Sequence, residues 1–213
     1  DSDGARARIS AAVELACKDL SLTSEQSDKV WIQQAIVMGM AKGYAEFYLK
    51  GDLQKYTLME AEASFEFPLP NGWKYRGKRD MVARRIKDKK VFLFEHKTTS
   101  KLDANYIAKL PLDSQILGYA LSVRKAMGKL PDGVVYNVAR KPQIRLKQSE
   151  TFEQFCQRIE DEYTTNPTLY FYRETLTFSD EDVKNFEDEL RRFSKEMQRA
   201  LDEGYFYLNT QHC

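Results

Sequence analysis

The sequence predicts an α/β protein in which a mixed sheet of order α-β-β-β-α-β is flanked by helices and followed by additional C-terminal helices. Two observations indicate this class. Segments with apolar residues at helical spacing occur beside strand-like segments, and three of the strand-like segments are consecutive. The length of 213 residues suits a single domain, with a core over about 24–140 and decoration over about 150–213.

The first two predicted elements are a long helix and a half-buried strand. Thr23 and Gln26 form a capping-box pattern, T-x-x-Q, before apolar residues at helical spacing from about 25 to 50, and Gly51 is the expected stop. From Thr57 to Leu69, Met, Ala and Phe alternate with Glu and Ser, which is typical of a strand with one buried face.

The next elements are a hairpin, a helix and a buried strand. A turn at 70–72 precedes strand-like runs over about 74–86 and 91–99, which the charged turn at 87–90 joins. We expect a helix from Asp113 to Met127, ended by Gly128, and then an apolar strand over 133–139.

The remaining pattern indicates outer elements. We expect a helix over about 151–164, a strand around 168–178 and an amphipathic helix over 179–203 that is capped by Ser179 and stopped by Gly204.

The composition excludes a membrane-spanning protein. Hydrophobic residues make up 42% and charged residues 31%, and no apolar run approaches the roughly 20 residues that cross a bilayer. The first residues do not resemble a secretory signal, and three widely spaced cysteines argue against a disulfide framework, so we expect a cytoplasmic protein.

Positive charge is concentrated in one segment although the formal net charge is only +1. Residues 75–101 contain ten basic and three acidic side chains, a local net charge of +7 (10 − 3): Arg76, Lys78, Arg79, Arg84, Arg85, Lys87, Lys89, Lys90, Lys97 and Lys101 against Asp80, Asp88 and Glu95. A solvated hairpin carries such charge too. The alternative is a surface that follows DNA phosphates, with Arg76 and Lys78 among its members.

Asp80, Glu95 and Lys97 are the candidate catalytic residues. A hairpin with its turn near Asp88 sets the two carboxylates side by side, which suits a hard divalent cation such as Mg²⁺ or Mn²⁺. Glu95 and Lys97 project from one strand face because strand side chains alternate. Phosphodiester hydrolysis requires a metal and a cation beside the attacking water or the transition state, and Lys97 suits the second role.

Each of these residues alone would be interpreted as surface charge, but their context favours a site. Glu95 follows the apolar run Val91–Phe94, where a carboxylate is costly without a metal or a cationic partner. The side chain of His96 points to the opposite face, so we expect it to pack. The hydroxyls of Thr98 and Thr99 would support the lysine or bind phosphate, although β propensity explains them equally well.

These motifs resemble the RecB-like branch of the PD-(D/E)xK nuclease superfamily. The sequences G-x-x-D (Gly77–Asp80), E-x-K-T-T (Glu95–Thr99) and Q-x-x-x-Y (Gln115–Tyr119) occur in the family's order, within about 39–139. The resemblance implies a restriction-endonuclease-like core in which Asp80, Glu95 and the backbone carbonyl of His96 bind the metal and Lys97 is the catalytic lysine.

The resemblance also implies that Gln115 and Tyr119 help to hold DNA. Residues four apart share a helix face, and an amide and a phenol can hydrogen-bond phosphate oxygens. The alternative is an ordinary polar edge of the helix.

The chain departs from the family pattern in three places. Arg79 replaces the proline before Asp80. Residues 39–46 lack the histidine that many relatives use as an extra ligand, so Glu46 is either an additional acidic ligand or an ordinary helix-face residue. Some relatives hold an iron-sulfur cluster with four cysteines. Here only Cys17 and Cys213 are suitably placed, since Cys156 is expected in the core, so we expect no cluster unless the chain continues beyond Cys213.

The resemblance therefore implies a metal-dependent DNA nuclease, foremost an exonuclease in DNA recombination, repair or phage DNA processing, in a bacterial cell or a phage-infected host. Two alternatives are a structure-specific endonuclease and a catalytically silent DNA-binding or assembly module with the nuclease fold. DNA is the expected partner, and a homo-oligomer or a recombination or annealing protein is compatible with this role; no membrane is involved.

Overall fold

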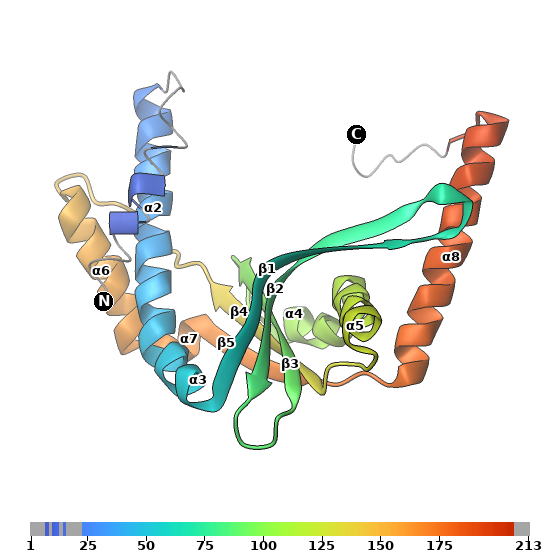
Figure 1. The fold of residues 1–213 in the computed structure, drawn as a ribbon. Coiled ribbons are helices and arrows are strands. Elements are labelled where there is room, and N and C mark those ends of the chain that lie inside the picture. Colours follow the sequence, from blue (N-terminus) through green and yellow to red (C-terminus); the bar gives the residue numbers. More distant parts are fainter. Residues whose placement is uncertain (1–6, 9, 13–14, 16–22, 207–213) are drawn as a thin grey trace. The chain divides into compact units, whose positions relative to one another are not determined.

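The computed structural model describes residues 7–8, 10–12, 15 and 23–206, and its fold is α/β. In chain order the elements are α2 (Ser24–Tyr44), η1 (Ala45–Leu49), α3 (Lys50–Lys55), β1 (Tyr56–Pro68), η2 (Pro70–Gly72), β2 (Lys74–Arg85), β3 (Val91–Thr99), α4 (Ala104–Lys109), η3 (Leu110–Leu112), α5 (Ser114–Met127), β4 (Gly133–Arg140), α6 (Phe152–Thr165), α7 (Pro167–Tyr170), β5 (Phe171–Leu176) and α8 (Asp180–Glu203) (Figure 1). η1 is a π-helix, and η2 and η3 are 3-10 helices.

Five strands form one mixed sheet in the order β1-β2-β3-β4-β5. β2 and β3 are antiparallel, with Met81 opposite Phe94 and Arg84 opposite Val91. Hydrogen bonds join the beginnings of β3 and β4 (Asp132 N to Val91 O, 2.7 Å) and their ends (Lys141 N to Thr99 O, 2.8 Å), so these strands run parallel. The α/β class and the consecutive strands were predicted correctly.

The N-terminal end of the first helix agrees with the sequence prediction. The Thr23 hydroxyl accepts a hydrogen bond from Gln26 N (3.3 Å), and the Gln26 side chain accepts one from Thr23 N (2.9 Å), which is the predicted capping box.

The predicted stop at Gly51 is wrong. The chain remains helical through η1 and α3 and becomes extended only at Tyr56 (φ −129°, ψ 145°). A glycine inside a helix costs only about 1 kcal/mol, and the next residue, Asp52, is buried and paired with Arg173. This long-range ion pair stabilises the helix beyond Gly51, the residue at which the local sequence predicted its end.

Three further details differ from the sequence prediction. The strand expected around 168–178 is shorter, because Pro167 begins the short helix α7. α4 and η3 lie in a segment for which no element was predicted. In β1, Glu62 has a positive φ of 50°, so the alternation holds for Ala63, Phe65 and Phe67 but not before them, where Met59 and Glu60 are both half-buried.

The chain divides into two compact units. Unit 1 contains residues 1–56, 96–107 and 137–174, and unit 2 contains residues 57–95, 108–136 and 175–213. Each unit combines three segments of chain. The single-domain expectation stays a prediction.

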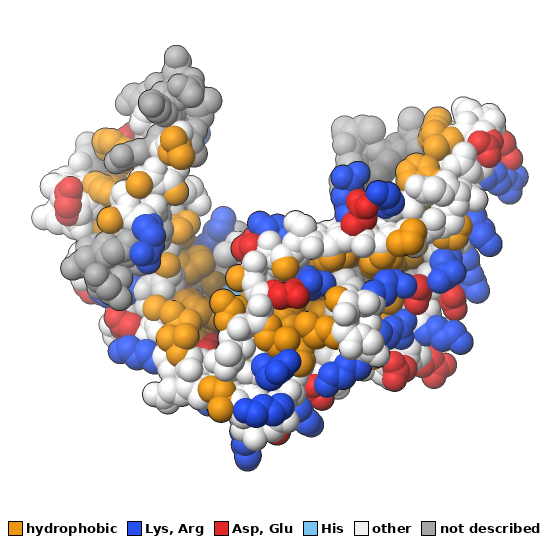
Figure 2. All heavy atoms as spheres, in the orientation of Figure 1, with side chains coloured by type: hydrophobic (Ala, Val, Ile, Leu, Met, Phe, Trp, Pro, Cys, Tyr) orange, Lys and Arg blue, Asp and Glu red, His pale blue; other side chains and the backbone are white. Residues whose placement is uncertain are grey.

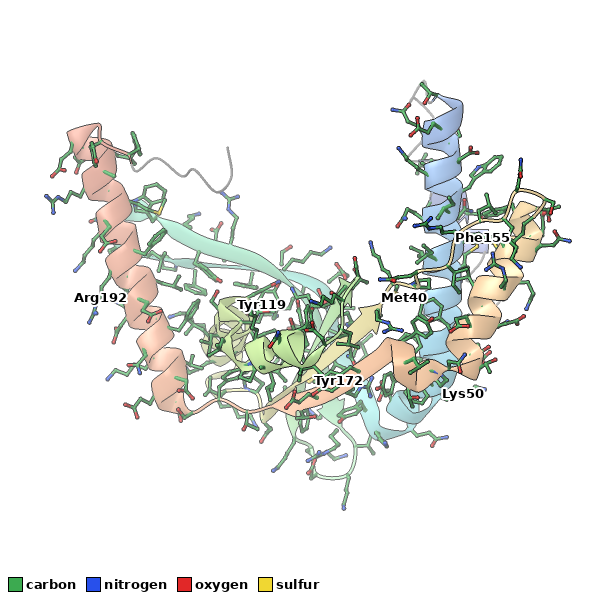
Figure 3. The ribbon with its side chains drawn as sticks, turned by 180° about the vertical axis from the view of Figure 1, so that it is seen from behind. Met40, Lys50, Tyr119, Phe155, Tyr172 and Arg192 are labelled. Carbon is green, nitrogen blue, oxygen red and sulfur yellow. The ribbon has the colours of Figure 1, made fainter. Side chains whose placement is uncertain are left out.

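In unit 1 the core lies between α2 and α6, which run side by side (Figure 3). Two glycines four residues apart allow this close approach. A Cβ atom at Gly39 would lie 2.7 Å from Ile159 Cγ2, and one at Gly43 would lie 2.7 Å from Tyr163 Cβ. Both positions therefore require glycine or a shift of α6.

In unit 2 the core lies between β1, α5 and α8. Phe67, Ala120, Leu121, Val183 and Phe186 are buried there. α8 begins at the predicted cap Ser179, and α5 begins one residue later than predicted because Asp113 is its N-cap; both helices end at the predicted glycines, which are left-handed. None of the described helices combines the length and apolar character needed to span a bilayer.

Candidate active site

The β2–β3 hairpin carries the two candidate metal-binding carboxylates. Met81 and Phe94 are cross-strand partners, Asp80 directly precedes the first, and Glu95 directly follows the second. Asp80 and Glu95 therefore lie at the same level of the hairpin, although 15 positions separate them in the sequence. Both belong to unit 2.

Glu95 is buried at the end of the apolar run of β3. Its side chain is 1% exposed, and Val91 to Phe94 before it are all buried, whereas Asp80 is half-buried. A buried carboxylate is costly unless a cation or hydrogen bonds stabilise its charge. A cation-binding role for Glu95 satisfies this requirement.

Burial alternates along β3 after Glu95: His96 and Thr98 are exposed, and Lys97 and Thr99 are half-buried. Glu95 and Lys97 therefore share one strand face. The boundary between the units falls within β3. Asp80, Glu95, Gln115, Tyr119, Arg76 and Lys78 lie in unit 2, and Glu46, His96, Lys97, Thr98 and Thr99 lie in unit 1.

The His96 side chain is held by two hydrogen bonds within unit 1. Its Nε2 lies 3.1 Å from the Tyr44 hydroxyl and 3.3 Å from Asn137 Nδ2. An amide nitrogen only donates, so Nε2 accepts, and the proton of the neutral ring lies on Nδ1. The sequence predicted a packing residue at this position; the ring also has a defined tautomer and orientation.

Arg173 on β5 donates hydrogen bonds to both partners of His96. Its Nε donates to Asn137 Oδ1 (2.6 Å), and its Nη2 donates to the Tyr44 hydroxyl (3.1 Å), so the Asn137 amide nitrogen and the Tyr44 proton are both directed at His96. Asp52 accepts two hydrogen bonds of 2.7 Å from the same guanidinium. We call these five residues the Arg173 network.

The packing of the Arg173 network brings an arginine onto an aromatic ring and shifts the pKa of a tyrosine. The guanidinium carbon lies 3.8 Å from the centre of the Tyr48 ring. Burial raises the pKa of Tyr44, and the nearby Asp52 carboxylate adds to this, although Arg173 opposes it. Sequence reasoning missed the Arg173 network, for which the one local signal is a polar Asn137 within an otherwise apolar strand.

Gln115 and Tyr119 share a face of α5, as predicted. Gln115 Nε2 donates to the Tyr119 hydroxyl at 2.5 Å. The Tyr119 ring (labelled in Figure 3) is 7% exposed and packs edge-on against Phe65, with the ring centres 5.8 Å apart. The body of Tyr119 therefore belongs to the core of unit 2, and its polar part is the hydroxyl that accepts from Gln115.

Arg79 was counted among the basic surface residues, and this interpretation is wrong. Its side chain is 6% exposed, Nη2 donates to Glu60 (2.6 Å), and Nη1 donates to the Ser122 hydroxyl (2.9 Å). Arg79 thus links β1 and α5 to β2 directly before Asp80.

The other predicted supporting residues have mixed surroundings. Arg76 and Lys78 are exposed, and Lys78 forms an ion pair with Glu62. Thr99 Oγ1 donates to Lys101 O (2.9 Å) and accepts from Lys101 N (3.1 Å), so it stabilises the turn after β3. Glu46 is exposed on η1.

Lysine and arginine side chains gather at the β2–β3 turn, whose residues 86–90 are all exposed (Figure 2). Arg85 and Asp88 pair across this turn at 2.6 Å. The positive surface of unit 2 therefore extends along the same hairpin that carries Asp80 and Glu95.

The residues present fit a small divalent cation. Mg²⁺ binds one or two carboxylates and completes its coordination with water and substrate phosphates, and Asp80 and Glu95 supply that number. No three His, Cys, Asp or Glu side chains gather as a metal-binding group in the described part of the chain. The expected third protein ligand is a backbone carbonyl, that of His96. Cys156 is buried in α6 as predicted, and Cys17 and Cys213 lie outside the described residues.

No protein-family model matches the chain, and no curated protein matches it significantly. A solved structure described as "Crystal structure of SSO0001" aligns at 18% identity, over 76% of this chain and 70% of that chain, with a TM-score of 0.29. Similarity at this level carries no argument about fold or function.

Proposed function

We propose that this protein is a metal-dependent DNA nuclease with a restriction-endonuclease-like core, whose catalytic residues are Asp80, Glu95 and Lys97. The observation that supports this most is the position of Asp80 and Glu95 on either side of the hairpin beside one cross-strand pair, with the Glu95 side chain buried. Two carboxylates so placed are suited to binding a cation rather than to ordinary surface solvation.

Bound Mg²⁺ or Mn²⁺ would polarise the phosphoryl oxygens and acidify the attacking water. Asp80 and Glu95, with the backbone carbonyl of His96, would hold it. The ammonium of Lys97 orients the water and stabilises negative charge that develops on the phosphoryl group. The Arg173 network fixes the ring of His96, and with it the backbone between Glu95 and Lys97.

The DNA strand is held by sequence-independent contacts. Arg76 and the exposed lysines of the β2–β3 turn contact phosphates, and Gln115 with the Tyr119 hydroxyl supplies hydrogen bonds from α5. This arrangement suits an exonuclease in recombination, repair or phage DNA processing, which must act on any sequence.

The test compares linear and closed circular duplex DNA in Mg²⁺, Mn²⁺ or chelator. We expect linear DNA to be degraded only with a metal, and Asp80→Asn and Lys97→Met each to lower the rate at least about 100-fold. Lys101→Met is the matched control, because Lys101 is an exposed lysine four residues further on. Wild-type rates in both site variants would contradict the assignment, and cleavage of circular DNA would favour an endonuclease.

A further inference from the structure

A cavity of about 300 Å³ lies in unit 1 at the carboxyl ends of β3 and β4. Its lining includes Ser100, directly after β3, and Arg140, the last residue of β4. Gln143, Ile144 and Tyr170 complete the lining. β3 and β4 are neighbouring parallel strands, and ligands of α/β sheets commonly bind outside the carboxyl ends of such strands. The cavity therefore lies where the sheet topology favours a ligand.

The polar side chains of this cavity are not used up by other parts of the protein. Ser100 and Gln143 are exposed, and neither side chain forms a hydrogen bond within the described residues. Arg140 forms no ion pair there, whereas Arg158 and Arg173 each bind a carboxylate. No described Asp or Glu lines the cavity. The cavity thus presents a positive charge and hydrogen-bonding groups without a competing negative charge.

The Arg140 side chain is held in place by packing on an aromatic ring. Its guanidinium carbon lies 4.9 Å from the centre of the Tyr170 ring, and Tyr170 is only 5% exposed. The Tyr170 hydroxyl donates to Glu162 (2.8 Å), which fixes the ring, and the Tyr163 hydroxyl donates to Arg140 O (2.8 Å), which fixes the backbone. A guanidinium has five N–H donors, so most of them remain available after its contact with one ring.

The loop after β4 adds further positive charge. Residues 140–147 contain four basic side chains and no acidic one: Arg140, Lys141, Arg145 and Lys147. The next acidic residue, Glu150, accepts two hydrogen bonds from Arg158, of 2.7 and 2.6 Å. Arg158 also donates to Arg145 O (3.0 Å), so the loop is tied to α6. An anion that approaches this end of the strands is therefore attracted by the whole loop.

Phosphate is the anion that fits these groups. A guanidinium binds phosphate oxygens through parallel N–H donors, and hydroxyl and amide groups commonly add hydrogen bonds to the same oxygens. Lys97 precedes Ser100 by three residues, roughly 10 Å of extended chain, and belongs to the same unit.

We propose that Arg140, with Ser100 and Gln143, binds a phosphate group of the DNA strand at a position separate from the catalytic residues. The inference rests on the proposed nuclease function, which supplies DNA as the ligand. A contact of this kind reads no sequence and fixes the register of the strand. It gives the protein a hold on the strand that does not depend on the metal.

The test measures binding of single-stranded oligonucleotides in Ca²⁺, with one phosphate at a time replaced by an uncharged methylphosphonate. In the wild type we expect an internal position at which the replacement weakens binding roughly 5- to 50-fold, the contribution of hydrogen bonds to a charged group. This measurement needs no variant protein. The position that belongs to Arg140 is the one whose effect disappears when Arg140 is replaced.

Arg140→Met removes the charge and keeps an unbranched side chain beside Tyr170, and a melting curve shows whether it is folded. It should weaken binding of the unmodified strand by the same factor and abolish the methylphosphonate effect at that one position. The slope of log affinity against log salt should become shallower by about 0.7. Arg140→Lys should keep the slope and recover part of the affinity, because it keeps the charge without the paired donors.

Arg192→Met is the matched control, because Arg192 is an exposed arginine on α8 (labelled in Figure 3) and its loss changes the net charge equally. It should leave every positional effect intact. Equal weakening by Arg140→Met and Arg192→Met, with no positional effect lost in either, would overturn the proposal. An Arg140-dependent effect confined to a terminal phosphate would support the site, with a phosphate monoester as its ligand.

The same experiments separate the two proposals. Wild-type protein that cleaves DNA in Mg²⁺ without an Arg140-dependent position would remove the phosphate site and leave the nuclease. An Arg140-dependent position in protein that does not cleave DNA would support the phosphate site and contradict the nuclease function. Protein that does not bind DNA at all would overturn both.

Discussion

Each unit holds an arginine near the proposed catalytic residues, the partly buried Arg173 in unit 1 and the buried Arg79 in unit 2, and the two are paired to different extents. Arg173 in unit 1 donates from all three of its nitrogen atoms, to Asp52, Asn137 and Tyr44. Arg79 in unit 2 donates to Glu60 and Ser122, and its Nε is buried with no hydrogen-bond partner in the described structure. Arg173 therefore acts through a complete network, and Arg79 through two separate contacts.

The carboxylates that pair with the two arginines also differ, in how far they are exposed to water. Asp52 is 12% exposed, whereas Glu60 is 33% exposed and can be hydrated if it loses its arginine. When a guanidinium is removed, the loss in the free energy of unfolding depends on whether water or other donors can stabilise the carboxylate that has lost its partner. This difference ranks the expected effects of substitution at Arg173 and Arg79, and a third arginine, the partly exposed Arg158, is added below.

The largest effect is expected for Arg173→Met. The substitution leaves the Asp52 carboxylate buried without its partner, and breaking such a pair costs about 3–5 kcal/mol in the free energy of unfolding. DNA cleavage should also fall, because Tyr44 and Asn137 no longer direct hydrogen bonds to His96. Urea unfolding measures the first and initial cleavage rates the second.

The control for this prediction is the double variant Asp52→Asn with Arg173→Met. Removing the stranded charge should restore part of the lost stability but not the orientation of His96. If Arg173→Met unfolded at the same urea concentration as the wild type, the Arg173 network would not contribute to the stability of the fold.

A smaller effect is expected for Arg79→Met. Glu60 can be solvated, so the loss is that of the buried Ser122 contact and one charged hydrogen bond, about 1–3 kcal/mol. The same urea measurement applies. A loss equal to that of Arg173→Met would contradict the ranking by exposure of the carboxylate.

The smallest effect is expected at the pair between Arg158 and Glu150, because Glu150 keeps a hydrogen bond from Lys147 N (3.1 Å) when the arginine is lost. The Arg158 guanidinium donates to both carboxylate oxygens of Glu150, at 2.7 and 2.6 Å. Arg158 lowers the pKa of Glu150 from 4.5 to about 2. A lowered pKa in the folded state stabilises the protein above pH 4.5, and this stabilisation is lost as the pH falls toward 2. Melting temperatures of wild type and Arg158→Ala should differ slightly at pH 6 and converge below pH 3. A constant difference would show that the pair does not titrate as expected.

Local signals in the sequence predicted much of the fold. The caps at Thr23 and Ser179, and the stops at Gly128 and Gly204, each depend on residues within a few positions and were correct. The hairpin was also predicted, because its turn and alternation are local.

Long-range interactions were not predictable in this way. Gly51 fails to end the helix because Asp52 meets Arg173, a residue 121 positions away. Arg79 is buried because Ser122 and Glu60 lie where the sequence alone cannot place them.

The most direct test of the central claim is the rate of Mg²⁺-dependent DNA cleavage by Glu95→Gln. Glutamine keeps the shape of the buried side chain and removes its charge, and a melting curve shows whether the variant is folded. We expect folded protein that cleaves linear duplex DNA at least about 100-fold more slowly than wild type, while chelator stops the wild-type reaction. Folded Glu95→Gln that cleaves at the wild-type rate, or wild-type cleavage that persists in chelator, would contradict a catalytic metal site at Asp80 and Glu95.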